Sequence, residues 1–433
     1  SIRKGYSADK AGLKAGDIIV SVDKQSLKNM ESAQLSMFLK GTPGSKIVLE
    51  IVRQGILLTK EVTRDKIVVD AVPFAEMIDE ETGYIALTRF NDKASSQVKK
   101  AYRKLKKEGM KNLIFDLRAN PGGSLLESIR ISNFFLPKGK KIVSTKAKIK
   151  KWSTVYNSKN SPLDLEIPLV VLINERSASA AEIVSGALQD YDRAVIMGKR
   201  SFGKGLVQRY RKLMYGTQLK LTISKYYTPS GRCIQELDYE NRDVKTGKVP
   251  KFSDTAIHAF KTENGRTVFD GGGIMPDIEI KTSIANASTK ALLKTKAIFN
   301  FATQYFYENS KIDSLVDFNF KNSDFYKFTN YLKSDTTFVT LQEALFKKAF
   351  LASKGSAISR AYPKIKVELF DDKIIEISKN KDLILARIKT EILERFFYME
   401  GVYQYHLKND KMISEALVLL RNKDIYSRVL LDN

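Results

Sequence analysis

The residues best suited to chemistry lie in one stretch of the chain, residues 174–208, which holds a serine among small residues and a lysine between two glycines. Ser179 follows an apolar run at 167–173 that is typical of a buried strand, and a helix is expected from Ser179 to about Asp190. A serine at such a junction lies beside outward-pointing amides and the positive end of a helix dipole. That environment favours an oxyanion, so Ser179 is a candidate nucleophile.

The same serine has a purely structural interpretation. Ser179 and Glu182 have the spacing of the S-x-x-E capping box, in which the serine only satisfies amides at a helix N-terminus. Taken alone, this motif favours capping over catalysis. Ser177 is a second candidate nucleophile, and it carries no such motif.

The candidate bases narrow the choice of mechanism. The chain has two histidines, His258 and His406, and neither lies in a glycine turn or at the end of a predicted strand. The G-x-S-x-G elbow of the α/β-hydrolases is absent. A Ser-His-Asp arrangement is therefore disfavoured, although the sequence leaves His258 open. The arrangement that remains is a serine with a lysine base.

Lys204 is the candidate base, because Gly203 and Gly205 on either side of it allow close approach of the backbone. A lysine acts as a base only when it is neutral, which requires apolar neighbours and no nearby carboxylate. A solvated loop lysine is the competing interpretation. If a strand begins at Gly205, Gln208 projects to the same face as Lys204 and can position the lysine or the substrate.

Two acidic residues of the predicted helix are given supporting roles. Asp190 shares a helix face with Ser179 but lies about 16 Å along the axis, too far to join it in a triad. Glu182 is nearer and belongs to the capping motif. Upstream, residues 113–117 read as a strand that ends in the turn 118–123, where a Pro-Gly-Gly sequence can present backbone N–H groups to an anion. The alternative is that this turn is only a tight connection.

The composition excludes several classes of protein. With 43% hydrophobic and 28% charged residues the chain is globular, not disordered or fibrous. A single cysteine, Cys233, excludes a disulfide framework and a cysteine-rich metal site. No apolar run reaches the roughly 18 residues of a spanning helix. The net charge of +24 fits a nucleic-acid partner or a lysine-rich composition, and without zinc-finger or RNA-binding motifs the second is preferred.

The order of elements predicts a multidomain α/β protein. Short apolar runs at 84–87, 113–117, 169–173 and 194–197 alternate with predicted helices at 97–108 and 125–135, which indicates α/β layering in a domain spanning 66–285. Residues 286–433 form a mainly helical domain. Its amphipathic helices are expected to bury their apolar residues, among them Leu345, Phe346 and Ala349. Loops or short helices are expected at 311–337.

The N-terminal segment 1–65 resembles a PDZ domain, an α+β module that binds peptide C-termini by strand addition. The similarity rests on a turn at 11–17, an apolar strand at 18–22, a short helix at 31–40 and an alternating strand at 46–52. The carboxylate-binding loop of the family is expected to precede Ser1. We therefore expect a truncated PDZ domain with an incomplete peptide groove.

The motifs DLRANPGG, ERSASAAEI, SFGKGLVQ, YYTPSGRCIQ and GGGIMPDI, in this order, resemble those of the C-terminal processing peptidases, serine proteases of the tail-specific type. The resemblance covers residues 1 to about 285 and implies a crotonase-like or ClpP-like core. It implies that the nucleophile is Ser179 and not Ser177. The other roles that it implies are Lys204 as general base, Gln208 as the residue that orients the lysine, and the oxyanion amides of Ala180 and Gly123, with Gly122 as the alternative.

The activity implied by the resemblance is endopeptidase cleavage of proteins with apolar, accessible C-terminal tails, through a Ser-Lys dyad and without a metal or organic cofactor. The family places such an enzyme in the bacterial periplasm or cell envelope. The helical domain is expected to permit homo-oligomers, and no nucleic-acid partner is expected. Two other functions are weighed against this one, namely an inactive PDZ and peptidase-like scaffold that binds proteins, and a basic nucleic-acid-binding protein.

Overall fold

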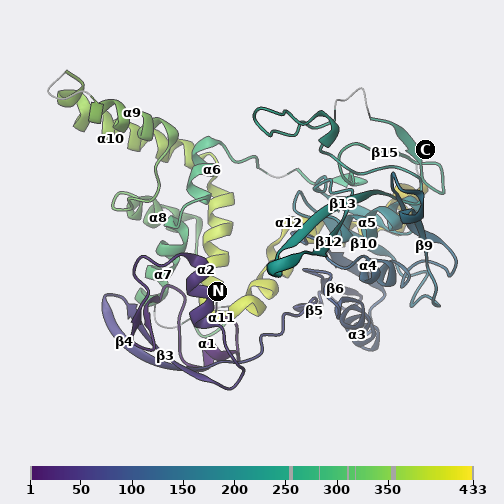
Figure 1. Ribbon diagram of the computed structural model, residues 1–433, viewed down its shortest axis with the longest axis horizontal. Coiled ribbons are helices and arrows are strands. Elements are labelled where there is room, and N and C mark those ends of the chain that lie inside the picture. The colour runs from purple at the N-terminus through teal and green to yellow at the C-terminus, as the bar shows by residue number, and fades with distance from the viewer. Residues whose placement is uncertain are drawn as a thin grey trace. The chain divides into compact units, whose positions relative to one another are not determined.

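The computed structural model describes residues 2–252, 257–281, 283–309, 312–316, 318–352 and 357–431 (Figure 1). Contacts divide the chain into two compact units. Unit 1 combines Ser1–Val68 with Thr282–Tyr405, and unit 2 combines Val69–Lys281 with His406–Asn433. The three domains expected from the sequence, 1–65, 66–285 and 286–433, remain a prediction. Unit 1 joins the first of these segments to most of the third, and unit 2 joins most of the second to residues 406–433.

Unit 2 is built on a mainly parallel sheet with the strand order β16-β11-β10-β7-β6-β5. Within this sheet the neighbouring strands β6, β7, β10, β11 and β16 all pair in parallel. Strand β5, at the edge, pairs antiparallel with β6. The α/β layering predicted from the sequence is confirmed. The bounds are β5 Phe74–Met77, β6 Thr82–Ala86, β7 Asn112–Asp116, β10 Leu169–Ile173, β11 Val195–Gly198 and β16 Ile278–Glu279.

One face of this sheet is covered by the helices α3 Ala94–Lys107, α4 Leu125–Ser132 and α5 Ala180–Asp190. Alternate residues of the central strands, such as Phe115 and Val171, point into their shared apolar core. Every residue of α5 is buried, and so is every residue of β7 and β10. Strands that are buried on both faces have unbroken runs of apolar residues, and such runs allowed β7 and β10 to be predicted from the sequence.

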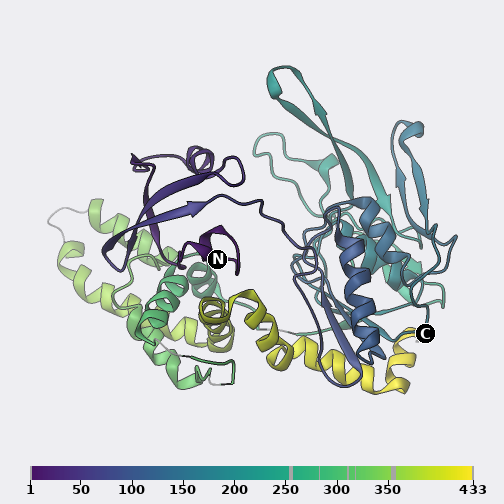
Figure 2. The same cartoon turned by 90° about the horizontal axis from the view of Figure 1, so that it is seen from below.

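The other face of the sheet is covered by the last helices of the chain, α12 Lys411–Arg421 and α13 Lys423–Leu431, drawn in yellow (Figure 2). Helix α12 contacts β7, β10 and β11, and its Ile413 and Ala416 are fully buried. From α13, the Tyr426 hydroxyl accepts from the N–H of Leu169 at 2.9 Å, where β10 begins. The chain therefore returns to unit 2 after completing the helical segment of unit 1.

A second sheet in unit 2 has the order β12-β13-β8-β9, and β12 and β13 form a long hairpin that projects from the unit (Figure 2). A small β14–β15 pair lies elsewhere in this unit. The bounds are β8 Lys141–Lys146, β9 Thr154–Asn157, β12 Leu206–Lys212, β13 Gln218–Tyr227, β14 Ala259–Lys261 and β15 Thr267–Phe269, with short 3₁₀ turns at Lys150–Trp152, Met214–Gly216 and Tyr239–Asn241.

The N-terminal part of unit 1 is a small sheet of order β2-β1-β3-β4 with two short helices. Ile51 and Leu49 of β3 and Val22 of β1 form its core. The strand and helix order matches the one expected from the sequence. The bounds are α1 Ser7–Lys10, β1 Ile18–Val22, β2 Gln25–Ser26, α2 Ser32–Leu39, β3 Lys46–Arg53 and β4 Ile56–Thr63.

The rest of unit 1 is helical, as predicted, and its core is rich in aromatic residues such as Phe301 and Phe328. One expectation is wrong: no residue of α9 is buried, so Leu345, Phe346 and Ala349 are not core residues. No helix of the described residues is long and apolar enough to cross a membrane. The bounds are α6 Ala287–Leu293, α7 Ala297–Glu308, a 3₁₀ turn Asn322–Asp324, α8 Phe325–Tyr331, α9 Leu341–Ala352, α10 Ala357–Ser378 and α11 Lys381–Asn409.

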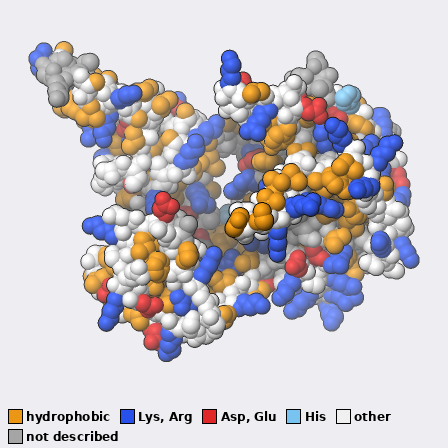
Figure 3. All heavy atoms as spheres, viewed as in Figure 1, with side chains coloured by type: hydrophobic (Ala, Val, Ile, Leu, Met, Phe, Trp, Pro, Cys, Tyr) orange, Lys and Arg blue, Asp and Glu red, His pale blue; other side chains and the backbone are white. Residues whose placement is uncertain are grey.

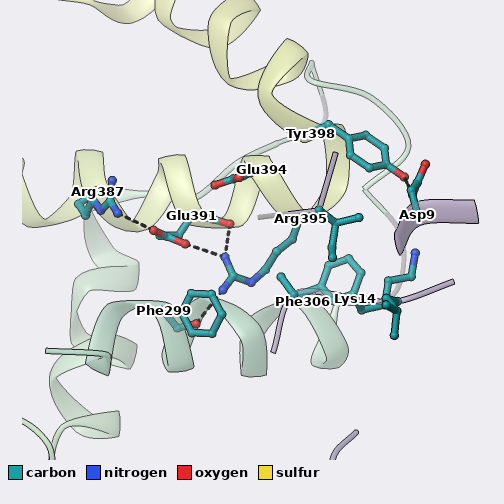
Figure 4. Close-up of a pocket in the computed structure, with 12 residues that line it drawn as sticks. Asp9, Lys14, Phe299, Phe306, Arg387, Glu391, Glu394, Arg395 and Tyr398 are labelled. Atoms are coloured by element: carbon teal, nitrogen blue, oxygen red, sulfur yellow. Dashed lines mark hydrogen bonds and ion pairs between the residues drawn. The ribbon is translucent and has the colours of Figure 1, made fainter. Parts of the chain in front are cut away.

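The two parts of unit 1 meet around a charged cavity (Figure 4). Arg395 of α11 is almost buried there; it donates to Glu391 at 2.9 Å and to the carbonyl of Phe299 at 3.0 Å, and its guanidinium lies over the Phe299 ring. The Tyr398 hydroxyl donates to Asp9 of α1 at 2.6 Å. These partners tie α11 to α7 and α1, so the lining of the cavity is explained by packing within the unit.

His406 lies in the last turn of α11 and makes the stability of the protein depend on pH. Burial lowers the pKa of its imidazole, against the opposing charge of Asp410. The unfolded chain therefore binds a proton that the folded chain resists, and the free energy of unfolding falls as the pH drops below about 6.5.

We expect His406→Gln to lose part of this acid sensitivity, by about 1.4 kcal/mol for each unit by which the folded and unfolded pKa values differ. Urea unfolding of wild type and variant at pH 7.5 and pH 5.5 measures the difference. His258→Gln is the matched control, because the His258 side chain is 72% exposed. Equal pH dependence in wild type and His406→Gln would contradict the expectation.

Candidate active site

Ser179 lies at a strained turn that joins β10 to α5. Its φ of +57° and ψ of −111° are unusual for a residue with a side chain, and α5 begins at the next residue. Such a conformation costs on the order of 1–3 kcal/mol and persists only where the surroundings impose it. The surroundings here include Glu182, which accepts from the Ser179 N–H at 2.6 Å, and the Tyr226 hydroxyl, which donates to the Ser179 carbonyl at 3.3 Å.

Glu182 is fully buried and binds four donors. One oxygen accepts from Ser179 N at 2.6 Å and from Lys204 N at 2.9 Å, and the other accepts from Ser201 Oγ and Gly203 N, each at 2.6 Å. Burial raises the pKa of this carboxyl, and the four hydrogen bonds oppose that shift. The carboxylate thus joins the backbone of the serine turn to the backbone of the lysine loop.

The lysine loop depends on its two glycines. A Cβ on Gly203, where φ is +82°, would lie 2.5 Å from the Cβ of Glu236, and a Cβ on Gly205 would lie 2.7 Å from the N of Gln235. Side chains at these positions would displace the backbone. The carbonyl of Lys204 accepts a short hydrogen bond from the Tyr226 hydroxyl, so the loop is held on both sides of the lysine.

A cleft of about 510 Å³ brings most of the candidate residues together. Ser179 and Lys204 both line it, although no hydrogen bond between Ser179 Oγ and Lys204 Nζ is found among the described residues. The side chain of Gln208 makes a long contact of 3.5 Å with Thr222 Oγ1. The residues that line the cleft are Pro121, Gly122, Gly123, Leu125, Ser179, Ala180, Ile183, Lys204, Leu206, Val207, Gln208, Tyr210, Lys220 and Tyr226.

Two backbone amides beside the cleft are suited to an oxyanion. Within the described part of the chain, the N–H groups of Gly123 and Ala180 have no protein acceptor, whereas the Gly122 N–H donates to Asn120 at 2.8 Å. This favours Gly123 over Gly122 as a donor to substrate. Gly122 is needed for space instead, because a Cβ there would lie 2.8 Å from the N of Ala180 and 2.7 Å from the carbonyl of Ala178.

Comparison with families of known proteins gives three matches in chain order. Residues 1–53 match a PDZ domain, residues 81–244 match peptidase family S41, and residues 288–420 match the probable PDZ-protease C-terminal helical domain. The segment that holds the candidate site therefore matches a peptidase family, which supports the resemblance to the C-terminal processing peptidases. The fold class expected from the sequence, a PDZ domain, a peptidase core and a helical domain, is confirmed.

Curated proteins similar to this chain include bacterial carboxy-terminal processing proteases. The chain is 36% identical over 234 residues to the carboxy-terminal processing protease CtpA of Bacillus subtilis, covering 54% of this chain and 50% of the relative. It is 39% identical over 234 residues to the carboxy-terminal-processing protease of Bartonella bacilliformis, covering 53% of each. The chain thus spans about half the length of the curated relatives it matches.

Among solved structures, the photosystem II D1 C-terminal processing protease is 26% identical, with a TM-score of 0.38 over 64% of this chain and 65% of that one. A putative S41 protease from Bacteroides fragilis is 18% identical, with a TM-score of 0.39 over 65% of this chain and 69% of that one.

The remaining candidate residues lie outside the cleft. Ser177 is fully buried, and its hydroxyl donates to the carbonyl of Leu117 at 2.7 Å, so it holds the turn. Asp190, at the far end of α5, pairs with the fully buried Arg232 at 2.6 Å. Neither His258 nor His406 is among the described residues that line the cleft.

Tyr226 is the site residue that sequence reasoning missed. Its hydroxyl reaches the carbonyls of both Ser179 and Lys204, and burial strongly raises its pKa, so the phenol stays protonated and donates. Only the fold shows this, because a tyrosine in a strand is ordinarily a core residue. The central position of Glu182 was likewise hidden behind its capping motif.

Glu182→Gln tests whether this carboxylate positions the site. An amide offers a single acceptor oxygen and turns its NH₂ toward backbone donors, which costs about 1–3 kcal/mol for each N–H left unpaired. With the serine turn and lysine loop no longer joined, we expect hydrolysis of an unfolded test protein to fall on the order of 100-fold. Fluorophosphonate labelling of Ser179 should slow in parallel.

The matched control is Asp190→Asn, which removes the other buried carboxylate of α5 but lies away from the cleft. It should lower the free energy of unfolding while leaving the rate per folded molecule near that of wild type. If the two variants lose activity only in proportion to lost stability, as measured by urea unfolding, Glu182 is a folding residue and not a positioning one.

Proposed function

We propose that this chain is a serine endopeptidase in which Ser179 is the nucleophile and Lys204 the general base. The observation that carries the proposal is the cleft that Ser179 and Lys204 share with the two unpartnered amides of Gly123 and Ala180. A nucleophile, a base and oxyanion donors around one space are the groups that acyl transfer requires.

In the proposed reaction, neutral Lys204 takes the proton of Ser179 as the Ser179 Oγ attacks the peptide carbonyl. The amides of Gly123 and Ala180 stabilise the oxyanion of the tetrahedral intermediate. The Lys204 ammonium then protonates the leaving amine as the C–N bond breaks. Lys204 then takes a proton from a water molecule as its oxygen attacks the acyl-enzyme, and returns that proton to Ser179 Oγ as the ester bond breaks and the new C-terminus is released.

The surroundings of Lys204 suit this role. Leu206, Val207 and Tyr226 line the same cleft as Lys204 and contribute apolar surface to it. The nearby carboxylate of Glu182 would keep the ammonium charged if it faced the Nζ atom, but both of its oxygens are engaged by other donors, including the Lys204 backbone N–H. Among the described residues, the Lys204 side chain has no carboxylate within salt-bridge distance, which a lysine base requires.

The substrates that we infer are proteins with accessible, apolar C-terminal tails, offered through the PDZ segment. Gln208 would orient the lysine or the substrate once the cleft is filled. The bacterial relatives and the family resemblance support a place in the periplasm or cell envelope. Assembly into homo-oligomers through the helical segment 286–433, and the division at residues 65 and 285, are part of the same proposal.

A second candidate function is an inactive scaffold that binds proteins. It is favoured by the absence of a hydrogen bond between Ser179 Oγ and Lys204 Nζ among the described residues, and by the contact of Gln208 with Thr222. Catalytic contacts in unliganded enzymes are often long, however, and tighten when substrate binds. The endopeptidase is therefore the preferred function.

Digestion of an unfolded test protein, with the cleavage sites mapped, distinguishes the two functions. Ser179→Ala and Lys204→Met should each lower the rate by on the order of 10⁴-fold, because the nucleophile and base act as a unit. Lys204→Arg should be equally inactive, since a guanidinium keeps its proton. Activity in Lys204→Arg would show that the residue only binds substrate.

Lys212→Ala is the control for the loss of a lysine, because Lys212 is exposed at the end of β12, the strand that follows the Lys204 loop, and does not line the cleft. Its rate should match that of wild type. Wild-type protein that neither cleaves the substrate nor reacts with a fluorophosphonate would leave the scaffold as the function.

A further inference from the structure

The β12–β13 hairpin carries an exposed apolar tip that peptide hydrolysis does not explain. Every residue from Arg209 to Thr222 is exposed. At the tip, the Leu213, Met214 and Tyr215 side chains are 49%, 77% and 96% exposed. Adjacent large apolar side chains at the end of a projecting element indicate a binding surface more often than a chance exposure.

The hairpin is also strongly basic. It carries Arg209, Arg211, Lys212 and Lys220, and no acidic residue occurs between Arg193 and Gln235. Among the described residues, none of these four side chains has a carboxylate within salt-bridge distance. Figure 3 shows basic and hydrophobic side chains next to one another where Figure 1 draws the hairpin. The surface therefore combines uncompensated positive charge with apolar contact area.

The two faces of the hairpin differ. Tyr210 lies opposite Lys220, and both line the active-site cleft. On the other face, Arg209 lies opposite Leu221 and Arg211 lies opposite Leu219, so bases alternate with leucines that are about 40% exposed. Binding through this outer face and the tip leaves the cleft side uncovered.

We propose that the outer face and tip of the hairpin bind an anionic lipid surface. Lysine and arginine are attracted to acidic headgroups, while their aliphatic stems and neighbouring leucine, methionine and tyrosine side chains enter the interface. A second copy of the chain is a poor occupant, because it would bring the same uncompensated cations against these. A convex tip with apolar side chains suits a deformable surface better than the pocket of a folded protein.

Binding of the 433-residue chain to vesicles tests the proposal independently of peptidase activity. We expect vesicles of phosphatidylglycerol and phosphatidylethanolamine to bind at least tenfold more protein than phosphatidylcholine vesicles, and the binding to weaken as salt is raised. Met214→Ser/Tyr215→Ser keeps every charge, and Arg209→Gln/Arg211→Gln keeps the tip. Each should weaken binding roughly tenfold.

The control for lost charge is Lys100→Gln/Arg103→Gln on the exposed face of α3, which should bind within about twofold of wild type. If it weakens binding as much as the Arg209/Arg211 variant, the effect is that of net charge and the proposal fails. The proposal also fails if the Met214→Ser/Tyr215→Ser variant binds vesicles like wild type, because the site would then recognise polyanions in general. It fails too if the protein forms dimers through the hairpin in gel filtration and does not bind vesicles.

A fluorescence measurement reports on the tip directly. The Tyr215→Trp variant has a second tryptophan besides the native Trp152. The fluorescence of the new tryptophan, obtained by subtracting the wild-type spectrum, should shift to the blue when phosphatidylglycerol vesicles are added, because its indole leaves water. An unshifted spectrum at saturating vesicle concentration would overturn insertion of the tip.

Discussion

The candidate active site depends on one buried carboxylate. Glu182 holds Ser179, Gly203 and Lys204 by their backbone N–H groups, so two loops far apart in the sequence are fixed by a single side chain. Charge-assisted hydrogen bonds are the stronger kind, and four of them offset part of the cost of burying the charge, although burial still raises the pKa of Glu182. The strained turn at Ser179 and the two-glycine loop are conformations that this anchor, together with Tyr226, makes persistent.

The sheet supplies the rigid frame for that anchor. Strands β7 and β10 end side by side at one edge, so the turn with Gly123 and the turn with Ser179 meet there. Helices cover both faces of this sheet, which prevents the strands from moving against each other. The lysine loop comes from a separate sheet, and its place is set by Glu182 and Tyr226 and not by strand pairing with β10.

How far the sequence predicts this arrangement depends on the range of the interactions. Strands β6, β7, β10 and β11 and helix α5 were located to within about two residues, because their apolar runs are local and continuous, whereas the edge strands β5 and β16 were not predicted. Ser179 and Lys204 were named from motifs, and the structure lines one cleft with them. The four hydrogen bonds of Glu182 and those of the Tyr226 hydroxyl join segments that are distant in the sequence. The periodicity of apolar residues along the chain cannot reveal such contacts. The apolar residues of α9 were predicted to be buried and are not, because an amphipathic pattern does not show whether another element packs on the apolar face.

The return of the chain to unit 2 has a consequence for how the molecule is made. The lysine loop precedes residue 230, yet α12 and α13, which cover one face of β7 and β10, are synthesised only after residues 282–405 of unit 1. Until residues 411–431 have left the ribosome, that apolar face has no cover. The fold of unit 2 is therefore discontinuous in sequence, and its sheet is covered on both faces only when residues on either side of unit 1's helical segment are both present.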